Sequence, residues 1–252
     1  MTPEVAALLA GAGLLAGAVN ALAGGGSLIS FPALLAAGYP PVTANVTNTV
    51  ALFPGYAGSV AGGRRELVGQ GPRLRSIGVT SVVGAVLGAT LLLTTPGDVF
   101  RAVVPFLILL ACALLVAQPR LARFVQRGTG SEKDARSPGL QVCVLLSAVY
   151  GAYFGAGLGV MLLGVLGVFL AEQLRVVNAL KNVVSVVVNA VALVAFGLFG
   201  PVAWEAVVVI AVASLTGGYL GARIAGRIPS ALLRAAVVAY GVVISVLLLV
   251  RG

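Results

Sequence analysis

Long apolar runs separated by short loops occupy almost the whole chain, and this feature restricts the fold more than any other. Only 9% of the 252 residues are charged and 60% are hydrophobic, whereas an average soluble domain has about 25% charged residues. Because a helix that crosses a bilayer needs about 20 apolar residues, we predict an all-α polytopic membrane protein with about seven to nine spanning or partly spanning segments. The apolar runs cover residues 4–22, 27–38, 42–62, 76–95, 100–118, 140–156, 158–171, 176–197, 204–226 and 231–250.

The net charge of +9, from 16 Lys and Arg against 7 Asp and Glu, does not indicate nucleic acid. Most of the basic residues lie in short loops, as the positive-inside rule expects of a membrane protein. Cys112 and Cys143 lie in apolar runs without a CxxC motif and are expected to be small buried side chains. The first residues, MTPEVAALLA, carry only Glu4 and lack the positive region of a cleaved signal peptide, so we expect them in the mature protein.

The stretch from Asn20 to Thr49 combines three consecutive glycines with polar residues in an otherwise apolar region. Gly24, Gly25 and Gly26 are poor helix formers, each less favourable than Ala by about 1 kcal/mol, so we predict that the helix unwinds there. Irregular backbone at membrane depth is tolerated only where it is buried in protein or lines a cavity. Elsewhere glycine lets membrane helices approach closely, and this packing role is preferred for Gly84, Gly88, Gly217, Gly218 and Gly221.

The two halves of the chain correspond when the sequence is shifted over itself by 133 residues without a gap. The shift places Asn45 on Asn178 and Pro96 on Pro229, and it places the glycine triplet on Gly157, Leu158 and Gly159. One register that holds from start to finish predicts an internal duplication. We therefore predict a first membrane repeat at 1–117, a basic cytoplasmic linker at 118–139 and a second membrane repeat at 140–252.

Basic residues gather in particular loops of the first half. Residues 62–75 carry four Lys or Arg and residues 118–139 carry five, so both loops are expected in the cytoplasm. The nearly uncharged turns at 36–43 and 94–98 are then expected on the outer side.

The second half has the opposite charge pattern, which predicts inverted repeats. Basic residues flank the turns near 173 and 228, whereas the turn at 197–201 has none, so counterpart loops lie on opposite faces, as inverted topology requires. Each repeat then needs a helical hairpin folded at its glycines, followed by three transmembrane helices. The second helix of each hairpin, at 27–38 and 158–171, is only about 18 or 21 Å long. These helices therefore either span the membrane or form re-entrant segments. Parallel repeats are the alternative if each hairpin is one broken crossing.

A polar cluster opens the third helix of each half. Asn45, Asn48 and Thr49 share one helix face by their spacing, and the shift places them on Asn178, Lys181 and Asn182. Both faces are expected to turn toward the opposing glycine break. Other polar side chains either line the same cavity or bond a neighbouring helix: Asn20, Ser27, Ser30, Tyr56 and Tyr153.

Lys181 is the one cation that does not plainly lie in a loop. A charged residue within a bilayer marks a functional site by default, although snorkelling to the headgroups is the simpler alternative. Helix N-termini at the glycine breaks attract anions. Together with two amide-rich helix faces, this single cation predicts a site for a small oxyanion.

Catalysis and metal binding are not expected. The chain has no His, which excludes a Ser-His protease within the membrane, and a Zn²⁺ or Mg²⁺ site lacks ligands. We therefore predict no enzyme activity, no metal and no cofactor. All seven carboxylates lie in loops or at helix ends: Glu4, Glu66, Asp98, Glu132, Asp134, Glu172 and Glu205.

Three segments resemble the sulfite exporter TauE/SafE family, also called the TSUP permeases. They are GAVNALAGGGSLISFPALLAAGYPPVTANVTNTVALFPGYAGSV in the first half, its echo GAYFGAGLGVMLLGVLGVF followed by NALKN in the second, and the basic RRE loop. The resemblance covers nearly the whole chain, including its duplication, and the GGG-S-P segment is its most specific part.

The resemblance implies a permease of the bacterial inner membrane for small sulfur-containing anions such as sulfite or sulfonates. The predicted substrate-binding set also contains Ser27, Asn48 and Lys181, which are included because of their positions in the sequence and not because of the resemblance. The family's substrate path is carried over to Gly24, Gly25, Gly26, Asn45, Thr49, Gly157, Gly159, Asn178 and Asn182.

The sequence thus favours a secondary transporter that works by alternating access of two inverted halves. Its expected partners are a small anionic substrate and the lipid bilayer, with no nucleic acid, and a homodimer stays open. The alternatives are a permease for another small solute, such as a divalent metal or neutral metabolite, and a membrane scaffold subunit that transports nothing. A polar cavity between the halves, reached by Asn45, Asn178 and Lys181, favours transport over scaffolding.

Overall fold

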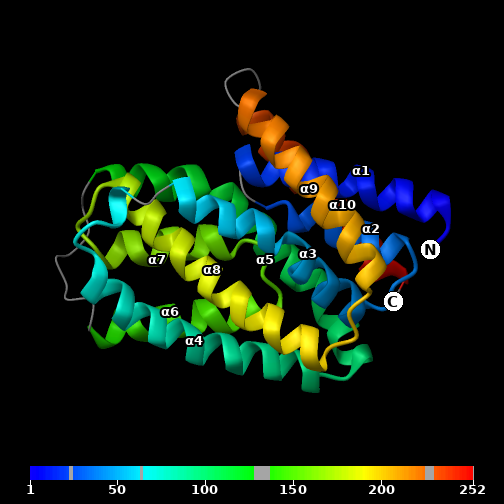
Figure 1. The fold of residues 1–252 in the computed structure, drawn as a ribbon, viewed down its shortest axis with the longest axis horizontal. Coiled ribbons are helices and arrows are strands. Elements are labelled where there is room, and N and C mark those ends of the chain that lie inside the picture. The colour runs from blue at the N-terminus through cyan, green and yellow to red at the C-terminus, as the bar shows by residue number, and fades with distance from the viewer. Residues whose placement is uncertain (23–24, 63–64, 128–136, 225–229, 252) are drawn as a thin grey trace.

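The structure is a computed structural model that describes residues 1–22, 25–62, 65–127, 137–224 and 230–251. Gly24 and the central residues of the predicted linker lie outside these ranges. Within them the secondary structure is helical (Figure 1). The helices are α1 (Pro3–Leu22), α2 (Ser27–Ala36), α3 (Pro41–Gly62), η1 (Arg65–Leu67), α4 (Gly71–Thr94), α5 (Gly97–Gln126), α6 (Pro138–Tyr153), α7 (Leu158–Phe169), α8 (Leu174–Phe199), α9 (Trp204–Ile224) and α10 (Ser230–Arg251).

Five of the described helices are long and apolar enough to cross a membrane, namely α1, α4, α5, α8 and α10. Large apolar side chains cover much of the outer surface; Val250 is 79% exposed and Phe199 is 77% exposed. A soluble monomer rarely exposes so much contiguous apolar surface. The prediction of an all-helical polytopic membrane protein is therefore confirmed.

The helices of the two halves correspond one to one under the 133-residue shift, and they pack in matching pairs. Helix α1 packs on α9, and its counterpart α6 packs on α4; α3 packs on α9, and its counterpart α8 packs on α4. The protein therefore contains a first bundle of α1, α2, α3 and α9 and a second bundle of α4, α6, α7 and α8. Each half contributes one helix to the bundle of the other half, and α3 packs on α8 between the bundles.

The helix unwinds at both predicted glycine breaks. Between α1 and α2, Gly25 has a φ of 92°, and the N–H of Gly26 donates to Asn20 Oδ1 over 2.7 Å. Between α6 and α7, Gly155 and Gly157 both have a φ of 82°. Only glycine adopts this left-handed conformation without strain. The short helices that follow, α2 with 10 residues and α7 with 12, fall where the sequence predicts the second arms of the hairpins.

Glycines bring the paired helices into backbone contact. A Cβ on Gly217 in α9 would lie 1.9 Å from the carbonyl oxygen of Leu14 in α1, and one on Gly88 in α4 would lie 2.2 Å from that of Val149 in α6. A Cβ on Gly84 would lie 2.7 Å from Ala148. The predicted packing role is confirmed for these three glycines. A Cβ on Gly218 would lie 3.7 Å from its nearest neighbour, the carbonyl oxygen of Gly17, which is an ordinary contact distance. Gly221 lies outside the described side chains.

Helix α5 extends further than its apolar run. It ends at Gln126, within the segment predicted as the basic linker. Leu121 and Val125 lie one turn apart on α5 and face the glycines of α7: a Cβ on Gly167 would lie 2.2 Å from Val125, and one on Gly164 would lie 3.4 Å from Leu121. This apolar contact holds the last turns of α5 in the fold.

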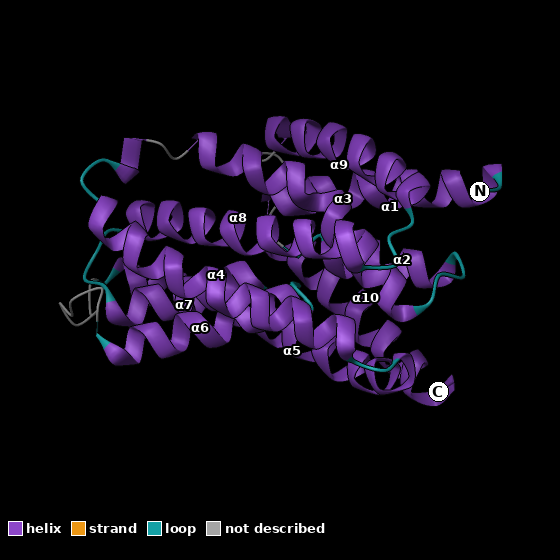
Figure 2. Ribbon diagram, turned by 60° about the horizontal axis from the view of Figure 1, so that its bottom comes forward, coloured by secondary structure: helices purple, strands orange, loops and turns teal. Residues whose placement is uncertain are grey.

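Five of the described turns lie at two opposite ends of the protein (Figure 1). The turns at 37–40, 95–96 and 200–203 lie toward the right, whereas those at 67–70 and 170–173 lie toward the left. Both termini lie at the right-hand side in the rotated view as well (Figure 2). We refer to these as the right-hand and left-hand ends of the protein.

Candidate functional site

A cavity of about 760 Å³ lies between the first and second bundles. Both halves of the chain line it, through α1, α2, α3 and α5 from the first half and α7, α8 and α9 from the second. Its walls are mixed, because Leu52, Leu158 and Leu163 stand beside polar groups. The polar side chains on its walls are Asn20, Ser27, Tyr56, Gln118, Lys181, Asn182, Ser185, Ser214 and Tyr219.

Lys181 supplies positive charge to this cavity. It lies about two turns into α8 and passes over Gly159, where a Cβ would be 3.8 Å from Lys181 Cδ. Among the described residues no carboxylate pairs with Lys181; the ion pairs present join Met1 to Glu205 and Arg73 to Glu172. An uncompensated cation in a mostly apolar enclosure is costly, so the site favours an anion.

The N-termini of the two short helices meet the same cavity. Gly25 and Ser27 line it at the start of α2, and Gly157 and Gly159 line it at the start of α7. The first N–H groups of a helix have no partner within the helix, and they carry partial positive charge. Several of these N–H groups already bond within the breaks: that of Gly26 donates to Asn20 Oδ1, and those of Val160 and Met161 donate to the carbonyl of Gly157. The charge of Lys181 and the partial positive charge of the two helix N-termini nevertheless meet the same cavity.

Half of the predicted substrate-binding residues line the cavity: Gly25, Ser27, Gly157, Gly159, Lys181 and Asn182. Gly24 lies outside the described residues. Gly26 is buried and bonded to Asn20. Asn178 is half-buried on α8 and does not line the cavity.

The polar cluster of α3 is packed into the protein rather than open to the cavity. Asn48 accepts a hydrogen bond from Ser30 Oγ at 2.5 Å, and Thr49 Oγ1 donates to the carbonyl of Asn45 at 3.0 Å. Asn45, Asn48 and Thr49 are all buried. The two polar clusters correspond in sequence, but in this conformation only the cluster of α8 reaches the cavity.

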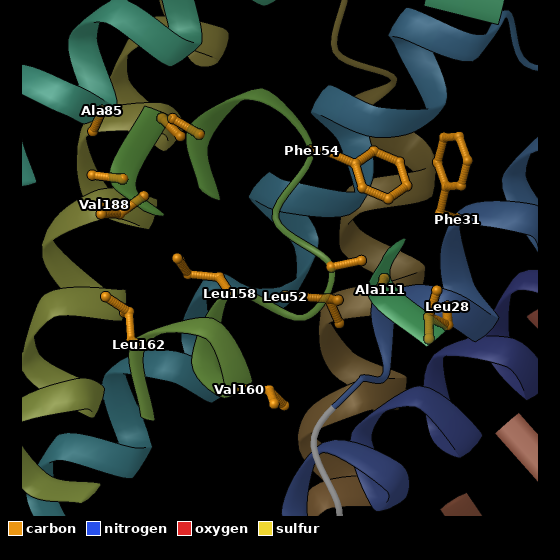
Figure 3. Close-up of a cluster of buried hydrophobic side chains, with 14 of the residues drawn as sticks. Leu28, Phe31, Leu52, Ala85, Ala111, Phe154, Leu158, Val160, Leu162 and Val188 are labelled. Carbon is orange, nitrogen blue, oxygen red and sulfur yellow. The ribbon is translucent and has the colours of Figure 1, made fainter. Parts of the chain in front are cut away.

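Two contacts join the bundles nearer the right-hand end of the protein than the cavity residues Tyr56 and Lys181. Asn45 Nδ2 donates to the carbonyl of Tyr153 at 2.8 Å. Phe31 and Phe154 face each other edge to face with ring centroids 5.5 Å apart (Figure 3). We call these four residues the closing contact. Tyr56, which lines the cavity, lies about three turns or 16 Å further along α3 than Asn45, so the closing contact and the cavity occupy different levels.

Several lining residues were not singled out by the sequence. Ser185 lies one turn beyond Lys181 and Asn182, so extending their helix face would have found it. Gln118, Ser214 and Tyr219 come from helices whose rotation the sequence does not specify. Of the residues left open, Asn20 and Tyr56 line the cavity, whereas Ser30 and Tyr153 do not.

Metal chemistry has no visible support in the described side chains. No group of three or more His, Cys, Asp or Glu lies close enough together in them to hold an ion. The site is therefore defined by one cation, amides, hydroxyls and backbone N–H groups.

Comparison with known proteins identifies relatives along nearly the whole chain. A probable membrane transporter protein, ORF9, of Sinorhizobium sp is 29% identical over 219 residues, which cover 85% of this chain and 80% of that protein. The probable membrane transporter protein YfcA of Escherichia coli K12 is 27% identical over 232 residues, which cover 90% of this chain and 82% of that protein. No solved structure matches the chain.

A family model matches residues 9–248, and its description is sulfite exporter TauE/SafE. The matched segment runs from α1 to α10 and includes both glycine breaks and Lys181. Apolar helices and transporter relatives agree that this is a multi-pass membrane protein. The chain belongs to the sulfite exporter TauE/SafE family.

Proposed function

We propose that this protein is a secondary transporter that moves a small sulfur-containing oxyanion, such as sulfite or a sulfonate, across the bacterial inner membrane by alternating access. The names of the relatives, probable membrane transporters, support the transport class. The family description supports sulfite as the first anion to test. The observation that carries the proposal is Lys181, which lines a cavity between the two halves without a described acidic partner.

The chemistry of the cavity supports an oxyanion over a cation or a neutral solute. Hydrogen bonds to charged groups stabilise by about 1.5–3 kcal/mol, and Lys181 can form one with an anionic oxygen. Asn182 offers a further donor from the second half, and Ser27 lines the cavity from the first half. The apolar wall at Leu52, Leu158 and Leu163 leaves room for the organic part of a sulfonate.

Inverted repeats are part of the proposal, and two observations support them. Counterpart helices pack in matching pairs across the two halves. Counterpart turns lie at opposite ends: 37–40 lies on the right and 170–173 on the left, while 67–70 lies on the left and 200–203 on the right. Inversion of this kind lets one protein present the same site alternately to the two sides of a membrane.

The charge of the loops supports a proposed orientation of the two ends in the membrane. Arg73, Arg75 and Arg175 flank the left-hand turns, which the positive-inside rule puts in the cytoplasm. The cavity residues Lys181 and Tyr56 lie in the left-hand halves of α8 and α3, and the closing contact lies nearer the right-hand end. The conformation is therefore proposed to be inward-facing.

Transport by purified protein in proteoliposomes tests this function. We expect uptake of radiolabelled sulfite or of an aromatic sulfonate, and we expect Lys181→Gln to raise the half-saturating anion concentration about 10- to 100-fold, the value of one charged hydrogen bond. Arg175→Gln is the matched control, because Arg175 is exposed on the same helix and should leave uptake unchanged. Uptake of a metal ion or a neutral solute, but of neither anion, would contradict the proposal that the solute is an oxyanion. The absence of uptake of any solute would favour a scaffold subunit.

A further inference from the structure

We propose that Asn45 and Asn178 are a matched pair of gating residues. In the outward-facing conformation, the side-chain amide of Asn178 donates to the backbone carbonyl of Asn20 and closes the cytoplasmic side. The proposal rests on the proposed transport function, because only a protein that alternates between two open sides needs a second closed side.

The first member of the pair is seen in the structure. Asn45 on α3 belongs to the first bundle, and it donates to the carbonyl of Tyr153 in the second bundle at 2.8 Å. Tyr153 is the last residue of α6, where the helix leaves its carbonyls without partners of their own. Asn45 therefore holds the two bundles together at the end of a helix that leads into a glycine break.

The second member follows from the correspondence of the two halves. The 133-residue shift that places Asn45 on Asn178 also places Asn20 on Tyr153. Asn20 lies in the last turn of α1, directly before the first glycine break, as Tyr153 lies before the second. The counterpart of the observed bond is thus a bond from Asn178 on α8 to the carbonyl of Asn20 on α1.

The present state of Asn178 and Asn20 agrees with an open gate. Asn178 is half-buried, and its side chain forms no hydrogen bond within the described part of the chain. Asn20 lines the cavity, so a bond between α8 and the end of α1 would draw the two walls together. This role explains a polar residue on α8 that does not reach the cavity in this conformation.

The same correspondence predicts the walls of the outward-facing cavity. Gly159, Lys181 and Asn182 line the present cavity, and their counterparts are Gly26, Asn48 and Thr49. These three are buried now and would be uncovered once the closing contact opens. The polar cluster of α3 then serves the outward-facing state, as the cluster of α8 serves the inward-facing one.

The closing contact is suited to open. Asn45 is 1% exposed, and its Oδ1 has no hydrogen-bond partner among the described atoms. A buried acceptor without a donor destabilises the conformation that contains it. The unpaired Asn45 Oδ1 therefore raises the free energy of the inward-facing state at the contact that must break.

Cysteine labelling without any substrate tests the gate. In a Cys112→Ala/Cys143→Ala background, Thr49→Cys reports outward opening in right-side-out vesicles, and its counterpart Asn182→Cys reports inward opening in inside-out vesicles. The reagent is a small membrane-impermeant methanethiosulfonate. Loss of one ordinary hydrogen bond changes an equilibrium about fivefold. We therefore expect Asn45→Ala to speed Thr49→Cys labelling about fivefold and Asn178→Ala to slow it by a similar factor.

The double variant and the second probe separate gating from local loosening. In the double variant Asn45→Ala/Asn178→Ala, the labelling rate of Thr49→Cys should lie within about twofold of the parent rate. Asn45→Ala alone should slow the labelling of Asn182→Cys, and Asn178→Ala alone should speed it. The proposal is overturned if Asn178→Ala speeds Thr49→Cys labelling as Asn45→Ala does, or if it changes neither probe. Labelling needs no anion, so the two assays can fail separately. If the labelling rates contradict the expectation while anion uptake still depends on Lys181, the gate alone is rejected. If the labelling rates are as expected but no anion is taken up, only the assigned solute is rejected.

Discussion

Gly26 and Gly159 occupy counterpart positions at the starts of the two short helices, but their surroundings differ. A Cβ on Gly26 would lie 2.3 Å from the carbonyl oxygen of Ala16 and 2.8 Å from the side chain of Asn20. A Cβ on Gly159 would meet only Lys181, at 3.8 Å. Gly26 is therefore packed tightly against α1, whereas Gly159 lies beside the cavity.

Alanine at the two positions should have different effects on stability. Gly26→Ala forces a methyl group into backbone, and overpacking of this kind destabilises by about 1–3 kcal/mol. Gly159→Ala places its methyl group at ordinary contact distance from a flexible side chain. In a thermal unfolding assay in detergent, we expect Gly26→Ala to lower the midpoint by several degrees and Gly159→Ala to leave it nearly unchanged. Equal midpoints for the two variants would show that the contact at Gly26 is not tight.

At the scale of helices, the glycine-packed pairs α1–α9 and α4–α6 are the most closely joined elements of the protein. Each pair takes one helix from each half of the chain, so it joins segments that lie far apart in the sequence. Backbone contact without intervening side chains leaves little freedom to slide. We therefore expect each pair to move as one unit when the bundles change position.

Neighbouring glycines of α9 offer a test of this tight pairing. Gly217→Ala would place its methyl group 1.9 Å from the carbonyl of Leu14, whereas Gly218→Ala would place one 3.7 Å from that of Gly17. We expect Gly217→Ala to destabilise the folded protein by about 1–3 kcal/mol or more and Gly218→Ala to be tolerated. Resistance to proteolysis and the yield of monodisperse protein in detergent measure the difference. Similar behaviour of both variants would mean that α1 and α9 adjust their spacing freely.

At the scale of the whole molecule, the arrangement of turns predicts where each loop lies relative to the membrane. Under the 133-residue shift, Val68 corresponds to Pro201 and Pro40 corresponds to Gln173. All four residues are exposed. Inverted repeats put the members of each pair on opposite sides of the membrane, whereas parallel repeats put them on the same side.

Single cysteines at these four positions distinguish the two topologies. In a background without Cys112 and Cys143, we expect Val68→Cys and Gln173→Cys to react with an impermeant maleimide only from the cytoplasmic side. Pro40→Cys and Pro201→Cys should react only from the outer side. Reaction of Val68→Cys and Pro201→Cys from one face would establish parallel repeats and remove the basis of the gating pair as well.

Much of the fold could be predicted because it depends on local physical rules. Apolar runs predict helices in a membrane, and the consecutive glycines predict unwinding at Gly25. Small residues at regular spacing predict the close approach at Gly84, Gly88 and Gly217. The end of α5 was harder to predict, because Leu121 and Val125 are ordered by α7, which lies far away in the sequence.

The sequence by itself determined that two similar halves would each place a glycine break next to a polar helix face, since hydropathy, backbone freedom and helix periodicity are local properties. It could not decide which of the two polar helix faces would line a cavity, because the 133-residue shift superposes Asn45, Asn48 and Thr49 on Asn178, Lys181 and Asn182. Only the tertiary structure decided that Lys181 lines the cavity while Asn45 bonds Tyr153. The physical reason is that two bundles in contact can be closed at one level and open at another, and which level is closed depends on contacts between residues far apart in the chain.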